Sequence, residues 1–216
     1  SHFQKDLVQD SYKVKTIRAE KLLTHTRFDI AFKLLYLEMK DGGALFAKEF
    51  YKEHIRAFSL GSFIEPGNEE KNSIEKFFGE FDKTFENIKA NGFDSSKALV
   101  PLSKNSSIAN GSHRVASAIY LGKNIECVKI DVRDHIYNYK FFYSRNVPSS
   151  ILDAVAIKFA EYAVNLHVAL IWPTAKEHEE EIEGIIPNIV YRKNVSLNSN
   201  GAHNLLSQIY YGEEWI

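Results

Sequence analysis

The chain has 216 residues, of which 44% are hydrophobic and 25% are charged, the proportions of a globular protein with one large or two small domains. Its 27 Lys and Arg residues against 28 Asp and Glu residues leave a net charge of −1, and no basic stripe stands out. Binding to a nucleic acid duplex depends on clustered basic side chains that neutralise several phosphates, so the charge argues against a DNA-binding module.

The cysteine content and the hydropathy pattern indicate the cellular compartment in which the protein works. A single cysteine, Cys127, excludes internal disulfides, and its place in an apolar strand-like segment indicates an inert, buried thiol. We find no signal peptide and no apolar run of about 18 residues, which argues against membrane insertion. We therefore expect a cytoplasmic protein.

Residues 12–60 are expected to be helical. Two segments there, 27–40 and 44–58, have the apolar spacing of helices. The first is apolar almost all round, so we expect it to be buried. Arg27, Asp29 and His54 lie in these segments. A lone helical histidine is more often a structural residue than a catalytic one, and we extend the same interpretation to Arg27 and Asp29.

A loop rich in Gly, Pro and Asn and dense in carboxylates follows at 61–73. Such loops, held by rigid elements, often carry catalytic residues. The next segment, 73–93, has the apolar spacing of an amphipathic helix, with Ser73 as its N-cap and Asn91-Gly92 at its end.

The most informative window is 107–122, in which a strand end, a glycine turn and a helix start come together. We expect strands before it and after it; they are 97–104, 106–110 and 124–132. The first N–H groups of a helix lack internal partners and carry partial positive charge, so a helix start attracts anions. Gly111 permits a tight turn, Ser112 can cap the helix, and His113 and Arg114 add side-chain donors, which together predict a phosphate site.

The last third of the chain reads as a β-α-β unit behind a first helix. The expected elements are a helix over 149–164, a buried strand over 167–173, a helix over 175–186 and a strand over 188–197. The charged run 177–181 is interpreted as a solvated helix face. His203 is a further candidate site residue.

The order of elements around the window, with the motif Asn110-Gly111-Ser112-His113-Arg114, resembles the ParB/sulfiredoxin-like superfamily over residues 63–132. That superfamily opens its motif helix with Asp-Gly-x-His-Arg, and its nucleotide-binding members wrap phosphates with this segment. The resemblance implies an α/β (α+β) fold with a ParB/sulfiredoxin-like core, N-terminal helices and a C-terminal β-α-β extension. It also implies that Asn110 to Arg114 bind the phosphates of ATP or another nucleotide.

Positions at which this chain differs from the superfamily's motif argue against several of the activities found in that superfamily. Sulfiredoxins carry a catalytic cysteine where this chain has Ser112, which argues against reductase chemistry. The partition proteins continue into a helical DNA-binding region, which this chain replaces with strands and helices. The free serine kinases are nearest in motif, but they have Asp where this chain has Asn110, which puts serine kinase activity in doubt.

Phosphotransfer to an alcohol needs a carboxylate to orient or deprotonate the hydroxyl, and usually Mg²⁺ to bridge phosphate oxygens. The loop carboxylates closest to the helix over 73–93 are the candidates: Glu65, Glu69, Glu70 and Glu75. In the serine kinases the base precedes this helix, and the resemblance therefore favours Glu69, Glu70 or Glu75. Each of them is equally compatible with a solvated acidic loop.

We expect three segments within one compact unit: N-terminal helices (1–60), the nucleotide-binding core (61–135) and the C-terminal extension (136–216). The tail also resembles multidomain bacterial enzymes of surface-polysaccharide assembly, which suggests a sugar-like acceptor and a module fused to further domains. The leading hypothesis is a nucleotide- and Mg²⁺-dependent kinase of a small hydroxyl-bearing substrate. The alternatives are a nucleotide-binding regulatory or DNA-associated switch and a noncatalytic module of a glycan-assembly enzyme.

Overall fold

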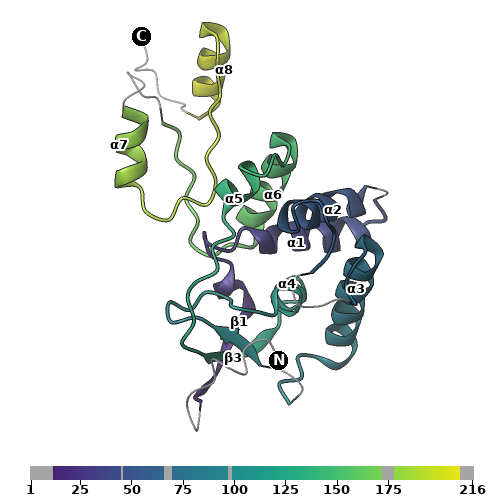
Figure 1. Cartoon of the computed structure of the whole chain (residues 1–216). Helices are drawn as coiled ribbons and strands as arrows, with labels where there is room; N and C mark the ends of the chain where they lie inside the picture. The colour runs from purple at the N-terminus through teal and green to yellow at the C-terminus, as the bar shows by residue number, and fades with distance from the viewer. Residues whose placement is uncertain (1–11, 45, 66–69, 97–98, 172–177, 210–216) are drawn as a thin grey trace.

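A computed structural model of the chain describes residues 12–44, 46–65, 70–96, 99–171 and 178–209 (Figure 1). The first half contains β1 (Val14–Arg18), the short 3₁₀ helix η2 (Ala19–Leu22), α1 (Asp29–Asp41), α2 (Ala47–Phe58) and α3 (Ile74–Asn91). The remaining elements are β2 (Val100–Leu102), α4 (Ser112–Tyr120), β3 (Asn124–Lys129), α5 (Tyr139–Tyr143), α6 (Ser149–Tyr162), α7 (His178–Ile185) and α8 (Ser199–Ile209).

The three strands form one mixed sheet in the order β1-β3-β2. β1 runs antiparallel to β3, with Val14 opposite Val128, and β2 runs parallel to β3, with Val100 opposite Cys127. After β2 the chain turns back, and Leu102 forms an isolated antiparallel bridge with Ile108. This return brings the chain from the sheet to the start of α4.

Helix α1 lies at the centre of the helical layer, and every residue from Asp29 to Leu37 is buried. It contacts α2, α4 and α6, while α3 packs on α4 (Figure 1). A helix that is apolar nearly all round must be covered on all sides, which is the arrangement the pattern of 27–40 predicts. α4 therefore lies between the sheet, α1 and α3.

The helices expected at 27–40, 44–58, 73–93 and 149–164 are confirmed by α1, α2, α3 and α6, and the helix start expected after Gly111 in the window 107–122 is confirmed by α4. The strands around the motif are shorter than expected, since β2 spans only Val100–Leu102 and the return strand is reduced to one bridge. Among the described residues, no helix is both long enough and apolar enough to cross a bilayer.

The expectation of helix throughout 12–60 is wrong at its beginning, because Val14–Arg18 forms an edge strand. The segment VKTIR contains three β-branched residues, which favour extended backbone. Its partner β3 is far along the chain, so local sequence does not reveal the pairing.

The expected C-terminal β-α-β unit is also wrong where the structure describes it. Residues 167–171 and 188–197 form no strand, and the side chain of Val168 is 93% exposed; positions 172 and 173 lie outside the described residues. The intervening helix is present as α7. α7 and α8 lie apart from the sheet in Figure 1, and an apolar segment without a neighbouring strand cannot complete its backbone hydrogen bonds as a strand. The fold is thus a mixed α/β fold with one small three-stranded sheet.

Candidate functional site

The motif segment begins α4 with a left-handed glycine. Gly111 is the N-cap residue, with φ 88° and ψ 27°, and its N–H donates to Asn110 Oδ1 at 2.6 Å. Ser112 is the first helical residue, whereas the sequence suggested it as the cap. The first-turn N–H groups of α4 have no acceptor within the helix, so this end carries partial positive charge.

Arg114 folds back underneath Gly111. Its Nη1 donates to the carbonyl of Leu99 at 3.1 Å, which ties the start of α4 to the segment entering β2. A Cβ atom at position 111 would lie 2.6 Å from Arg114 Nη2. A side chain at position 111 would therefore be strained by the positive φ and would have to displace this guanidinium.

His113 turns inward, toward α2 and α3. Its ring stacks on Phe81 with a centroid distance of 4.6 Å and an interplanar angle of 18°. Its Nε2 lies 2.6 Å from the hydroxyl oxygen of Tyr51. One of the two ring nitrogens is thus engaged within the protein.

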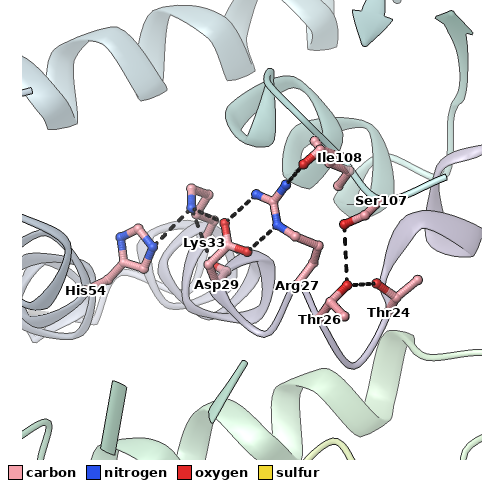
Figure 2. A network of polar contacts seen from close by, with 8 residues as sticks. All are labelled: Thr24, Thr26, Arg27, Asp29, Lys33, His54, Ser107 and Ile108. Atoms are coloured by element: carbon pink, nitrogen blue, oxygen red, sulfur yellow. Dashed lines mark hydrogen bonds and ion pairs between the residues drawn. The ribbon is translucent and has the colours of Figure 1, made fainter. Parts of the chain in front are cut away.

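Tyr51 leads from His113 to a buried polar network beneath α4. The Tyr51 ring stacks on His54 at 5.5 Å, and His54 Nε2 lies 3.2 Å from Lys33 Nζ. Lys33 Nζ lies 3.3 Å from Asp29 Oδ2 and from the Asp29 carbonyl (Figure 2). His54 Nδ1 is buried and has no hydrogen-bond partner in the described part of the chain.

The network ends at the segment that enters the motif. Arg27 donates to both carboxylate oxygens of Asp29, at 2.7 and 2.8 Å, and also to the carbonyl of Ile108 (Figure 2). A second contact lies beside it, in which Thr26 Oγ1 is 3.3 Å from Ser107 Oγ. The network thus connects α1 and α2 to the return segment that delivers the chain to Gly111.

The network holds an excess of positive charge. Burial alone would raise the pKa of Asp29, but the charges of Arg27 and Lys33 outweigh burial and hold it well below its usual range. Burial lowers the pKa of Lys33 to about 8, against the opposing effect of Asp29. Burial and the nearby Lys33 also hold the pKa of His54 well below its usual range. Near neutral pH this network therefore contains two cations (Arg27 and Lys33), one carboxylate (Asp29) and a neutral histidine (His54).

Lys71 is a further buried cation, on the side of α3, and two carboxylates flank it. Its side chain is 6% exposed, and its Nζ lies 3.1 Å from Glu65 Oε2 and 2.9 Å from Glu80 Oε2. The N–H of Glu65 donates to the carbonyl of Lys71 at 3.0 Å, which closes the loop between them. The charge of Lys71 contributes to lowering the pKa of His113, so Lys71 lies near the motif.

The three carboxylates favoured as the base lie in different positions. Glu69 lies outside the described residues, and Glu70 is exposed. Glu75 is exposed in the first turn of α3, where its own backbone N–H and the Ser73 hydroxyl lower its pKa. Glu65 and Glu80 are the carboxylates held next to Lys71.

Sequence reasoning missed Tyr51 and Lys71. Tyr51 and His54 are three residues apart and share one face of α2, so their spacing was a usable signal. Lys71 had no such signal, since its burial depends on the packing of α3 and the loop. The structural interpretation of Arg27, Asp29 and His54 agrees with their burial.

In the described part of the chain, no three His, Cys, Asp or Glu side chains gather as a metal site. Cys127 is buried, and burial raises its pKa to about 11, so its thiol stays protonated. Comparison with models of known families, with curated proteins and with solved structures finds no match for the chain.

Proposed function

We propose that the protein binds the phosphate groups of ATP or another nucleotide at the N-terminus of α4, with Asn110, Gly111, Ser112, His113 and Arg114 around them. The observation that carries this proposal is the left-handed Gly111, which begins a nine-residue helix and leaves no Cβ in front of its first turn. Backbone N–H groups at such a helix start bind phosphate oxygens, and the Arg114 guanidinium, which fills the space of a Cβ at position 111, adds positive charge there.

The charge around α4 supports an anionic ligand. The cations Lys33, Lys71 and Arg114 all help to lower the pKa of His113, which means that their fields reach the motif. The carboxylate of Asp29 opposes them, and Glu65 and Glu80 pair with Lys71. The positive charge left near the helix N-terminus is therefore that of Lys33 and Arg114, and it favours an anionic group.

We further propose that the bound phosphoryl group is transferred to a hydroxyl of a small polar substrate such as a sugar. The hydroxyl oxygen would form a bond to the terminal phosphorus of the nucleoside triphosphate as the bond from that phosphorus to the leaving nucleoside diphosphate breaks. A loop carboxylate would take the hydroxyl proton. Glu69, Glu70 and Glu75 remain candidates for that carboxylate, and Glu65 joins them through its contact with Lys71. Mg²⁺, when bound, would neutralise charge on the phosphates.

A charge substitution at the start of α4 tests binding. Ser112→Asp places a negative charge in the first turn, which suits the helix dipole but repels phosphate. We expect the thermal shift produced by ATP, ADP or CTP, with and without Mg²⁺, to be largely lost, while the unliganded protein unfolds at the same temperature or higher. Ser149→Asp, at the first position of α6, is the matched control and should leave the nucleotide shift intact.

Transfer is tested separately once binding is established. The protein is incubated with the nucleoside triphosphate that it binds and with a panel of sugars. Mass spectrometry should then reveal a sugar product that is heavier than the starting sugar by one phosphoryl group. Binding without any product would contradict the kinase proposal and favour a nucleotide-binding switch. Absence of a thermal shift with every nucleotide would contradict both.

A further inference from the structure

The contact between Tyr51 and His113 determines which ring nitrogen of His113 is left for a ligand. We infer that Tyr51 is a positioning residue, which holds His113 in the tautomer with its proton on Nδ1 and so makes Nδ1–H the donor that His113 offers to a phosphate oxygen. The donor role rests on the proposed function, whereas the tautomer does not.

The direction of the hydrogen bond follows from partner counting. The Tyr51 hydroxyl lies 2.6 Å from His113 Nε2 and has no other hydrogen-bond partner among residues that the structure describes. If Nε2 carried the proton and donated, the buried hydroxyl proton of Tyr51 would lack an acceptor, which costs about 1–3 kcal/mol. When Tyr51 donates to an unprotonated Nε2, both groups are satisfied.

The charge states of the pair support the same direction. Burial raises the pKa of Tyr51 well above its usual range, with further contributions from Tyr36 and Glu65, so its hydroxyl keeps its proton. A neutral tyrosine and a neutral histidine can be joined by O–H to Nε2 or by Nε2–H to the hydroxyl oxygen, and only the first arrangement gives the Tyr51 proton an acceptor and places the imidazole proton on Nδ1.

His113 stays neutral because of the groups that surround it. Burial is the main cause of its lowered pKa, and the cations Lys33 on α1, Lys71 before α3 and Arg114 on α4 lower it further against the opposing charge of Asp29. Stacking on Phe81 fixes the plane of the ring, and the contact with the Tyr51 hydroxyl fixes which edge of the ring faces α2. With its pKa lowered, His113 offers a neutral N–H near neutral pH.

The tautomer can be measured in the 216-residue chain without any nucleotide. Long-range ¹H–¹⁵N spectra of histidine-labelled protein between pH 6 and 8, with the His113 signal assigned by its loss in His113→Gln, distinguish a protonated Nδ1 from a protonated Nε2. We expect protonated Nδ1 in the wild type and substantial protonated Nε2 in Tyr51→Phe. Tyr36→Phe is the control, since it removes a hydroxyl that donates to Asp82 at 2.9 Å within the same aromatic cluster. A protonated Nε2 in the wild type would overturn the inference.

Ligand affinity tests the donor role. Losing one well-oriented hydrogen bond to a charged phosphate should weaken nucleotide binding by on the order of tenfold in Tyr51→Phe and in His113→Gln. His113→Asn keeps an N–H at the position of Nδ1 and should retain most of the affinity, and Tyr36→Phe should bind as the wild type. Equal affinities for Tyr51→Phe and Tyr36→Phe would overturn the donor role. If the wild type binds no nucleotide, the proposed function and the donor role fail together, while the spectra still decide the tautomer.

Discussion

Gly111 is constrained by its backbone and by its neighbour. Its φ of 88° belongs to the left-handed region, and the Arg114 guanidinium occupies the space into which a Cβ would project. Arg114 is in turn held by the carbonyl of Leu99. The shape of the proposed phosphate site therefore depends on the pair of residues 111 and 114, and Arg114 contributes by shaping the turn.

Substitution of Gly111 by alanine should be more destabilising than the same change at a glycine that has only the positive φ. Gly122, just beyond the other end of α4, has φ 60°, and a Cβ atom added there would meet no atom within 4 Å. Gly122→Ala should therefore cost about 1 kcal/mol of the free energy of unfolding. Gly111→Ala should cost about 1–2 kcal/mol more, because Arg114 must leave Leu99. Chemical denaturation of both variants measures the difference, and equal losses would contradict the packing of Arg114.

At the scale of elements, two consecutive apolar segments in the last third of the chain differ in burial. α6 packs against α1, and its Val155 is fully buried. Residues 167–171, which belong to the buried strand predicted over 167–173, form no strand and are exposed. Pattern alone cannot separate these cases, because a strand also requires a neighbour with free backbone groups.

A pair of valine to threonine substitutions tests this contrast, since each replaces one methyl group by a hydroxyl at nearly constant volume. Val155→Thr should lower the free energy of unfolding by about 1–3 kcal/mol, because the hydroxyl is buried in an apolar environment. Val168→Thr should change it by less than about 0.5 kcal/mol, because the side chain is exposed. Comparable losses at both positions in urea titrations would indicate that residues 167–171 are buried, as the sequence suggested.

At the scale of the whole molecule, the stability depends on charges buried between α1, α2 and the motif segment. Arg27, Asp29 and Lys33 are all buried, and the pair of Arg27 with Asp29 is neutral by itself. Lys33 adds an uncompensated charge to the interior. A buried charge of this kind makes global stability depend on pH.

The contribution of Lys33 to the free energy of unfolding should rise by about 2 kcal/mol between pH 7.5 and 9.5. The pKa of Lys33 is lowered to about 8, so in this window the folded state releases a proton that the unfolded chain still binds near its usual pKa of about 10.4. Cys127 acts in the opposite sense, because its raised pKa keeps the thiol protonated in the folded state while the unfolded chain ionises. The Lys33 contribution is therefore measured as the difference in unfolding free energy between the wild type and Lys33→Met, which should change by about 2 kcal/mol across the window. The difference between the wild type and Lys158→Met should show no such change, because the nearby Glu38 and Glu161 outweigh burial and raise the pKa of Lys158. Denaturation at several pH values measures both differences, and a difference for Lys33→Met that does not vary with pH would contradict this assignment.

The sequence pattern alone predicted the features that depend on neighbouring residues in the chain. The helical segments, the breaks between them and the glycine before the motif helix follow from apolar spacing and from backbone freedom, both of which neighbouring residues express. The tertiary structure alone decided the pairing of β1 with β3, the failure of the C-terminal segments to form strands, and the inward turn of His113 toward Tyr51. These features depend on contacts between residues far apart in the chain, and such contacts leave no periodicity in the sequence.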